Sequence, residues 1–169
     1  AFHIPDEVCD FFRARAAEGA ALRTGWEQRF AAWAHDNPVK SAQWEAVWTR
    51  EVPRDLVAQL LAAAPVGAAA TREHGRASLQ KAAELVPALA GGAADLASST
   101  FTTIKGGGDI AVGSFDGRNL HFGVREHAMG AILNGIAYHG AFRPFGSTFL
   151  VFSDYMRGAI RLAALSNLP

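Results

Sequence analysis

Residues 120–140, LHFGVREHAMGAILNGIAYHG, contain the clearest change from strand to helix in the chain. The stretch from Leu120 to Val124, LHFGV, predicts a short strand. Apolar residues then recur at helical spacing up to Gly140, a residue type that commonly ends helices. These residues are Met129, Ile132, Leu133, Ile136 and Ala137. Glu126 lies at the junction, and parallel α/β sheets bind ligands at such strand ends.

The segments on both sides of this stretch repeat the alternation of strand and helix. Two further strands are predicted at residues 89–96 and 145–152, and two further helices at residues 79–86 and 156–164, the last one beginning behind Ser153 or Asp154. This alternation is typical of an α/β fold in which helices flank a parallel sheet. We expect residues 65–169 to form this domain. Because only three strands are visible, we also expect an incomplete sheet in a truncated chain.

Residues 1–64 differ from the rest of the chain and predict a helical segment. All four tryptophans lie here, between Trp26 and Trp48, and most of the aromatic residues recur at helical spacing. Pro53 is expected at the first position of the last of these helices, because proline is common there. So much aromatic area on short helices is expected to pack against other surfaces.

The composition excludes several classes of protein. The 169 residues carry 16 basic and 16 acidic side chains, so no basic field favours nucleic acid or an anionic membrane. One cysteine rules out an internal disulfide framework, and the six histidines lack metal-binding spacing, so we predict no metal site in this chain. The first residues do not resemble a signal peptide. We therefore expect a soluble, cytoplasmic protein.

Three groups of residues have a pattern that suits chemistry, although each also has a structural interpretation. Glu126 is either a functional carboxylate or a first-turn residue that stabilises its helix. Phe149, Phe152 and Tyr155 are spaced three apart and form either a stacking surface for a flat ring or part of the core.

Arg72 and Ser99 are the third group. Both are predicted on loops at one edge of the sheet, where they would hold a phosphate or remain solvated. Residues 105–118, KGGGDIAVGSFDGR, are rich in glycine, but the lysine precedes the glycines and no GK[ST] follows. This stretch is therefore not a P-loop, and we predict a surface loop.

Four stretches together resemble the transketolases. They are Ala70-Thr71-Arg72, Gly91 to Ala97 (GGAADLA), Phe122 to Gly135 (FGVREHAMGAILNG) and Phe145 to Phe152 (FGSTFLVF). The run from Phe122 to Gly135 is the most specific of them. The resemblance implies that residues 1–64 are a helical connector from a preceding diphosphate-binding domain. It implies that residues 65–169 are the front part of a pyrimidine-binding domain.

The resemblance also implies roles for single residues. Glu126 matches the glutamate that hydrogen-bonds the aminopyrimidine of thiamine diphosphate, and Asp95 matches an aspartate of the cofactor site. Three aromatic residues match positions around the same ring, namely Phe149, Phe152 and Tyr155. Arg72 and Ser99 match positions that bind the substrate phosphate. Ala93 departs from the pattern, since the family usually has serine in GGSADL.

The implied reaction moves a two-carbon ketol unit from a ketose phosphate to an aldose phosphate. It implies thiamine diphosphate and Mg²⁺ as cofactors, with Mg²⁺ held mainly by a domain outside this chain. It also implies sugar phosphates as substrates and a homodimer with the active site between subunits. This chain alone is expected to be inactive. The alternatives are a deoxyxylulose-phosphate synthase, a dihydroxyacetone synthase, or a non-catalytic partner module.

Overall fold

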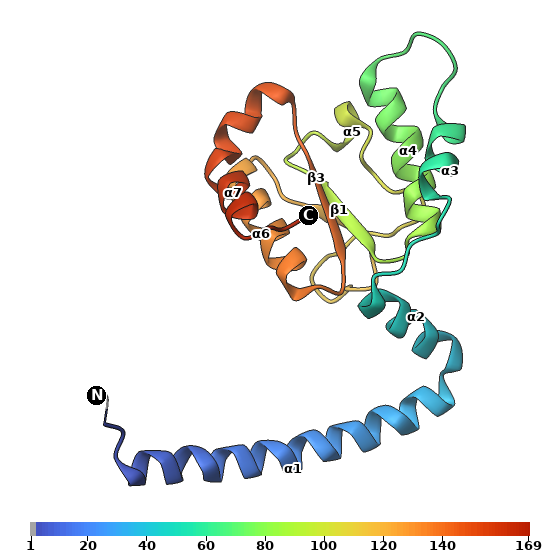
Figure 1. Ribbon diagram of the computed structural model, residues 1–169. Helices are drawn as coiled ribbons and strands as arrows, with labels where there is room; N and C mark the ends of the chain where they lie inside the picture. The colour runs from blue at the N-terminus through green and yellow to red at the C-terminus, as the bar shows by residue number, and fades with distance from the viewer. Residues whose placement is uncertain (1–2) are drawn as a thin grey trace. The chain divides into compact units, whose positions relative to one another are not determined.

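The computed structural model describes residues 3–169, which form two compact units (Figure 1). One unit ends at Glu45 and the other begins at Ala46. Helix α2, Pro38–Thr49, runs across this division. The domain boundary predicted after residue 64 stays a prediction, because a division into compact units does not by itself show where one domain ends and the next begins. In the described part of the chain, no helix is long and apolar enough to cross a membrane.

The first unit consists mainly of helix α1, Asp6–Asp36, and the start of α2. None of the α1 residues is buried. Its aromatic rings pack on one another around Phe30, whose ring centroid lies 5.1 Å from that of Trp26, 5.5 Å from Trp33 and 5.6 Å from Trp44. Because residues at i, i+3 and i+4 share one face of a helix, the spacing in the sequence brings Trp26, Phe30 and Trp33 together on α1, while Trp44 reaches Phe30 from α2.

The second unit is built on a parallel sheet of three strands, which confirms the predicted α/β fold. The strands are β1 (Leu89–Ala93), β2 (Asn119–His121) and β3 (Arg143–Ser147), in the order β2-β1-β3. Strand β1 lies in the centre and pairs with both neighbours in parallel. Gly91 is required in this strand, because a Cβ there would collide with the backbone of Phe145 on β3.

Helices cover both faces of the sheet (Figure 1). They are α3 (Leu56–Ala63), α4 (Thr71–Leu85), the short α5 (Ala97–Thr100), α6 (Glu126–His139) and α7 (Ser153–Leu165). Met129 on α6 is fully buried and packs with Ala94 and Phe122 in the core. Helix α6 ends at Gly140, which adopts the left-handed conformation with φ 90°. Glycine adopts this conformation without the steric cost of a side chain.

Several predicted element bounds were wrong. The third strand is shorter and earlier than residues 145–152, because its pairing with β1 begins at Arg143 and ends at Ser147. The apolar residues that follow have no strand to pair with and form a 3-10 turn, Leu150–Phe152. Helix α3 begins at Leu56 and not at Pro53, whose carbonyl instead accepts a hydrogen bond from the Leu56 amide.

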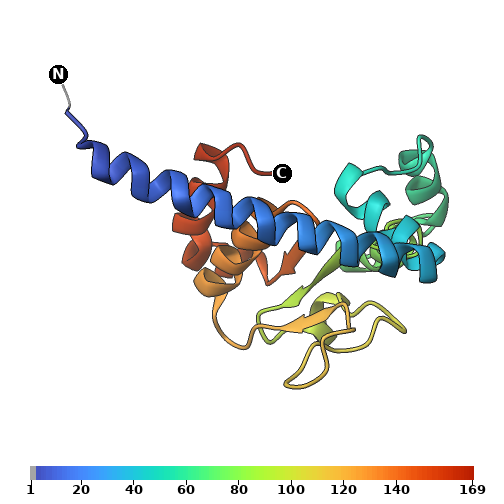
Figure 2. The same cartoon turned by 90° about the horizontal axis from the view of Figure 1, so that it is seen from below.

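Residues 105–118 form a loop, as predicted, which extends beside the sheet (Figure 2). The Asn119 side chain fixes this loop to the start of β2. Its Oδ1 accepts a hydrogen bond from the Ile104 amide at 2.8 Å, and its Nδ2 donates to the carbonyls of Ile104 and Gly108 at 3.1 and 2.9 Å. Asn119 is only 5% exposed, so these backbone groups depend on it for their hydrogen bonds.

Arg118, the neighbour of Asn119, fixes the same loop to the end of α4 and the start of β1. Its guanidinium donates hydrogen bonds to the carbonyls of Ala83 and Val86, which end α4, and to that of Leu89, which begins β1. A cation is favourable at a helix C-terminus because the last carbonyls carry partial negative charge. Burial lowers the pKa of the Arg118 guanidinium. Arginine nevertheless stays charged in proteins, so this contact persists across the physiological range.

We expect Asn119→Ala in the complete protein to loosen this loop. The substitution removes the partners of three backbone groups, at a cost of about 1–3 kcal/mol. Amide hydrogen exchange of residues 104–110 should become faster, while that of α6 and α7 stays unchanged. Asn37→Ala is the matched control, since the Asn37 side chain is bonded only to the Trp33 carbonyl on α1. Unchanged exchange in Asn119→Ala would show that the loop is held by other contacts.

Candidate functional site

A cavity of about 400 Å³ opens beside the carboxyl ends of β1 and β2, and we refer to it as the carboxylate cavity. Its lining comes from the turn after β1, the turn after β2, the start of α6 and the start of α7: Ala94, Asp95, Leu96, Val124, Glu126, Phe152 and Tyr155. Most of this wall is apolar or aromatic. Two carboxylates, Asp95 and Glu126, lie within it. Four of the five cofactor residues predicted from the sequence are thus brought together here.

Glu126 is the first residue of α6 and is only 9% exposed. Its carboxylate forms no hydrogen bond or ion pair with any residue in the described range 3–169. Its oxygens are not sealed from the cavity, because Thr148 Oγ1 alone, among the described residues, is a buried side-chain polar atom without a partner. The carboxylate can therefore accept a hydrogen bond from a ligand group in the cavity. The strand-to-helix junction predicted for Glu126 is present, since β2 ends at His121 and α6 begins at Glu126 itself.

Asp95 lies two residues after the end of β1 and adopts the left-handed conformation with φ 59°. Strand β1 was predicted to run to residue 96, but it ends at Ala93. Aspartate tolerates this left-handed conformation better than most residues. The resulting bend sends the chain into α5, so Asp95 faces the carboxylate cavity while Ser99, four residues later, lines a second cavity.

The three predicted aromatic residues stack in a row. The ring centroids of Phe149 and Phe152 are 6.0 Å apart with an interplanar angle of 17°, and those of Phe152 and Tyr155 are 6.2 Å apart at 31°. Phe152 and Tyr155 line the carboxylate cavity, whereas Phe149 lines the second one. Tyr155 is 65% exposed, so this row forms a surface rather than part of a closed core. The interpretation as core residues is therefore wrong for Tyr155.

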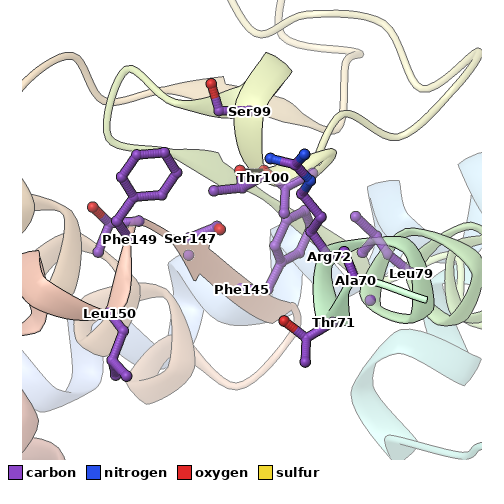
Figure 3. Close-up of a pocket in the computed structure, with 14 residues that line it drawn as sticks. Ala70, Thr71, Arg72, Leu79, Ser99, Thr100, Phe145, Ser147, Phe149 and Leu150 are labelled. Atoms are coloured by element: carbon purple, nitrogen blue, oxygen red, sulfur yellow. Dashed lines mark hydrogen bonds between the residues drawn. The ribbon is translucent and has the colours of Figure 1, made fainter. Parts of the chain in front are cut away.

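The second cavity, of about 720 Å³, lies between the start of α4, α5 and the end of β3 (Figure 3). We refer to it as the arginine cavity. It contains both residues predicted to bind phosphate, Arg72 and Ser99. Their prediction on loops was wrong, because α4 begins at Thr71 and the short α5 spans Ala97–Thr100. Further hydroxyl groups on its wall belong to Thr71, Thr100, Thr102, Ser147 and Thr148. Figure 3 shows the Arg72 guanidinium pointing from α4 toward the side formed by Ser99 and Thr100. A cation among hydroxyl groups suits an anionic, oxygen-rich ligand group.

The sequence analysis missed two features near these cavities. His121, at the end of β2, contacts Asp109 of the loop with 2.9 Å between Nε2 and Oδ1. The ring of Phe101 lies beneath two arginine side chains, Arg72 and Arg76. No signal in the sequence indicated the second feature, because the helix was predicted to begin only at residue 79, whereas α4 begins at Thr71 and carries both arginines. No set of three metal-ligating side chains occurs in residues 3–169.

Two family models match the chain. The transketolase pyrimidine-binding domain matches residues 67–169, and the transketolase thiamine diphosphate-binding domain matches residues 1–53. The transketolase of Geobacillus stearothermophilus is 46% identical over 169 residues, which cover 99% of this chain and 25% of that protein. The transketolase of Physarum polycephalum is 43% identical over 170 residues with the same coverage. The chain therefore spans about a quarter of the length of these relatives.

Solved structures agree with these matches. The transketolase from Leishmania mexicana superposes with a TM-score of 0.89 at 36% identity, covering 98% of this chain and 25% of that chain. A Pichia stipitis transketolase in complex with sedoheptulose 7-phosphate superposes with a TM-score of 0.88 at 37% identity. That match covers 100% of this chain and 26% of the other.

Proposed function

The chain belongs to the transketolase family, and from that premise we propose that the intact protein transfers a two-carbon ketol unit between sugar phosphates with thiamine diphosphate. The donor would be a ketose phosphate and the acceptor an aldose phosphate. One observation carries the proposal: the Glu126 side chain is largely enclosed, its carboxylate has no partner among the described residues, and it lines a cavity with aromatic rings.

The carboxylate cavity suits the aminopyrimidine ring of thiamine diphosphate. The ring is flat and aromatic, and Phe152 and Tyr155 offer aromatic surface beside it. The ring also carries nitrogen atoms that can donate a hydrogen bond when protonated, and the Glu126 carboxylate can accept that hydrogen bond. We therefore propose that this ring is held by Asp95, Glu126, Phe152 and Tyr155. Phe149 would stack against the Phe152 ring and fix its position.

In this proposal Glu126 is the catalytic residue of the chain. Its carboxylate would hold a proton on a nitrogen of the aminopyrimidine ring, and the apolar wall would keep water from competing for that hydrogen bond. When bound, thiamine diphosphate supplies the electron sink that allows the carbon–carbon bond of the ketose to break. The aromatic row excludes water from one side of the ring and fixes its orientation.

Arg72 and Ser99 would bind the substrate phosphate in the arginine cavity. The guanidinium offers planar N–H donors that match phosphate oxygens, and the hydroxyl adds one further donor. Binding of the phosphate in the arginine cavity would orient the sugar and would distinguish phosphorylated from unphosphorylated substrates.

The exposed aromatic residues of the site support a proposal about the subunit that covers them. Phe149 and Tyr155 are 41% and 65% exposed, a large aromatic area for one surface. We propose that a second subunit of a homodimer covers it and supplies the remaining cofactor contacts. The Mg²⁺ that accompanies the diphosphate would be held by parts of the protein outside residues 3–169. We propose a cytoplasmic location, where sugar phosphates are found.

The test is an assay of the complete protein with xylulose 5-phosphate and ribose 5-phosphate. We expect sedoheptulose 7-phosphate to form, activity to be lost when thiamine diphosphate is removed, and activity to return when the cofactor is restored with Mg²⁺. Product formation without added cofactor in the stripped protein, or no sedoheptulose 7-phosphate in its presence, would contradict the proposal. The second outcome would favour one of the related thiamine enzymes or a non-catalytic module.

A further inference from the structure

Arg72 is held in an unusual way for an exposed arginine. Its guanidinium forms no hydrogen bond or ion pair with any residue among those described, 3–169. It contacts an aromatic ring instead, since Cζ lies 5.2 Å from the centroid of Phe101. A ring face attracts the cation without using its N–H groups. The contact with Phe101 therefore positions Arg72 and leaves its donors for a ligand.

Phe101 is placed for this contact by the local backbone. It follows Ser99 and Thr100 directly and caps the C-terminus of α5, where its amide donates to the Ala97 carbonyl. Its φ of 56° is left-handed, which is a costly conformation for a bulky side chain. Such conformations persist only where surrounding contacts determine them, and they cluster at ligand sites.

Arg76 adds a second part to this arrangement. Its Cζ lies 4.9 Å from the centroid of the same ring, and its Nη2 contacts Oε2 of Glu73 at 2.6 Å. Glu73 adjoins Arg72 in the chain and is the acidic residue of the first turn of α4. Because Arg76 engages the Glu73 carboxylate, that carboxylate is not available to neutralise Arg72.

We propose that Phe101 is the positioning residue for Arg72, and that Arg76 keeps Glu73 away from it, so that the arginine cavity presents an unpaired guanidinium to a phosphate monoester. This inference rests on the proposed function for the identity of the substrate. The recognition of phosphate itself follows from the chemistry of the guanidinium and can be tested without turnover.

The first test compares Phe101→Leu with Phe101→Tyr in the complete protein. Loss of the ring removes an exposed cation–π contact, and we expect the KM for a phosphorylated sugar to rise roughly two- to fivefold. The KM for the unphosphorylated counterpart and kcat with either substrate should stay unchanged. Tyrosine retains the ring face, so Phe101→Tyr should behave as the unmodified protein. The matched control is Phe115→Leu, at a 78% exposed residue of the 105–118 loop.

The second test measures binding of inorganic phosphate by ³¹P NMR, which does not depend on turnover. We expect weaker binding in Phe101→Leu and also in Arg76→Gln, because the latter frees Glu73 to pair with Arg72. Adding Glu73→Gln to Arg76→Gln should restore binding, since no carboxylate then remains to compete. Such a restoration identifies an electrostatic role, because a general loss of structure would not be reversed by a second substitution.

The outcomes separate this inference from the proposed function. Equal phosphate binding and equal KM values in Phe101→Leu and Phe101→Tyr overturn the positioning role. The competing role of Glu73 is overturned if Arg76→Gln binds phosphate normally. If phosphate binding follows the expected order but no ketol transfer occurs, the inference stands and the proposed function fails.

Discussion

Replacing Glu126 with alanine in the complete protein should lower turnover by about 10²–10⁴-fold, the usual range for loss of a general acid–base group. The fold should remain, because the Glu126 side chain forms no hydrogen bond or ion pair within residues 3–169. The substitution therefore breaks no polar side-chain contact among the described residues. Steady-state kinetics with saturating cofactor and circular dichroism of the same preparation would test both expectations.

Two further variants make this result specific. Glu126→Gln keeps the shape of the side chain but cannot exchange a proton with a ring nitrogen, so its turnover should fall nearly as far. Glu84→Ala is the control, because Glu84 is an exposed residue of α4 that pairs with Lys81. If Glu126→Gln retained most of the activity, Glu126 would act through shape or hydrogen bonding alone and would not be the catalytic acid.

Replacing Arg72 with alanine should raise the KM for phosphorylated sugars by about 10- to 100-fold. A hydrogen bond to a charged group contributes about 1.5–3 kcal/mol, which corresponds to that ratio. The KM for unphosphorylated analogues should stay close to its original value, because Arg72 lies in the arginine cavity and not in the carboxylate cavity. The ratio of the two KM values, measured in one series, is the informative quantity.

The control for this variant is Arg54→Ala. Arg54 lies outside both cavities, and its loss removes the same charge from the protein. A general effect of net charge on sugar phosphate binding would appear in both variants. An equal rise of KM for phosphorylated and unphosphorylated sugars in Arg72→Ala would contradict a phosphate-binding role.

The sequence was sufficient for the parallel α/β fold because short strand candidates alternate with segments of helical periodicity along the chain. It located the α6 helix well, since an apolar stripe and a terminal glycine define both its face and its end. It placed β3 wrongly, because strand bounds depend on the partner strand. Pairing with β1 recruits Arg143 and Pro144, two residues of low strand propensity, and Pro144 is tolerated because β3 is an edge strand.

The candidate site was predictable where a residue follows a strand end. Glu126 and Asp95 face one cavity for this reason. Arg72 reaches the other cavity from the first turn of α4, which precedes β1, so its place there was not predictable from a strand end. The contact between Phe101 and Arg72 was not predictable, because it depends on a left-handed residue that turns the ring toward α4. Neither charge nor apolar periodicity encodes such a turn.

The stacked rings of Phe149 and Phe152 form a shared wall, since each ring lines a different cavity. Because only these two rings separate the cavities at this point, a substitution that changes the shape of one cavity here also affects the other. A smaller residue at position 149 would enlarge the arginine cavity for bulkier substrates, but it would also remove the backing of Phe152. Variants designed for a wider substrate range at this wall should be screened for cofactor affinity at the same time.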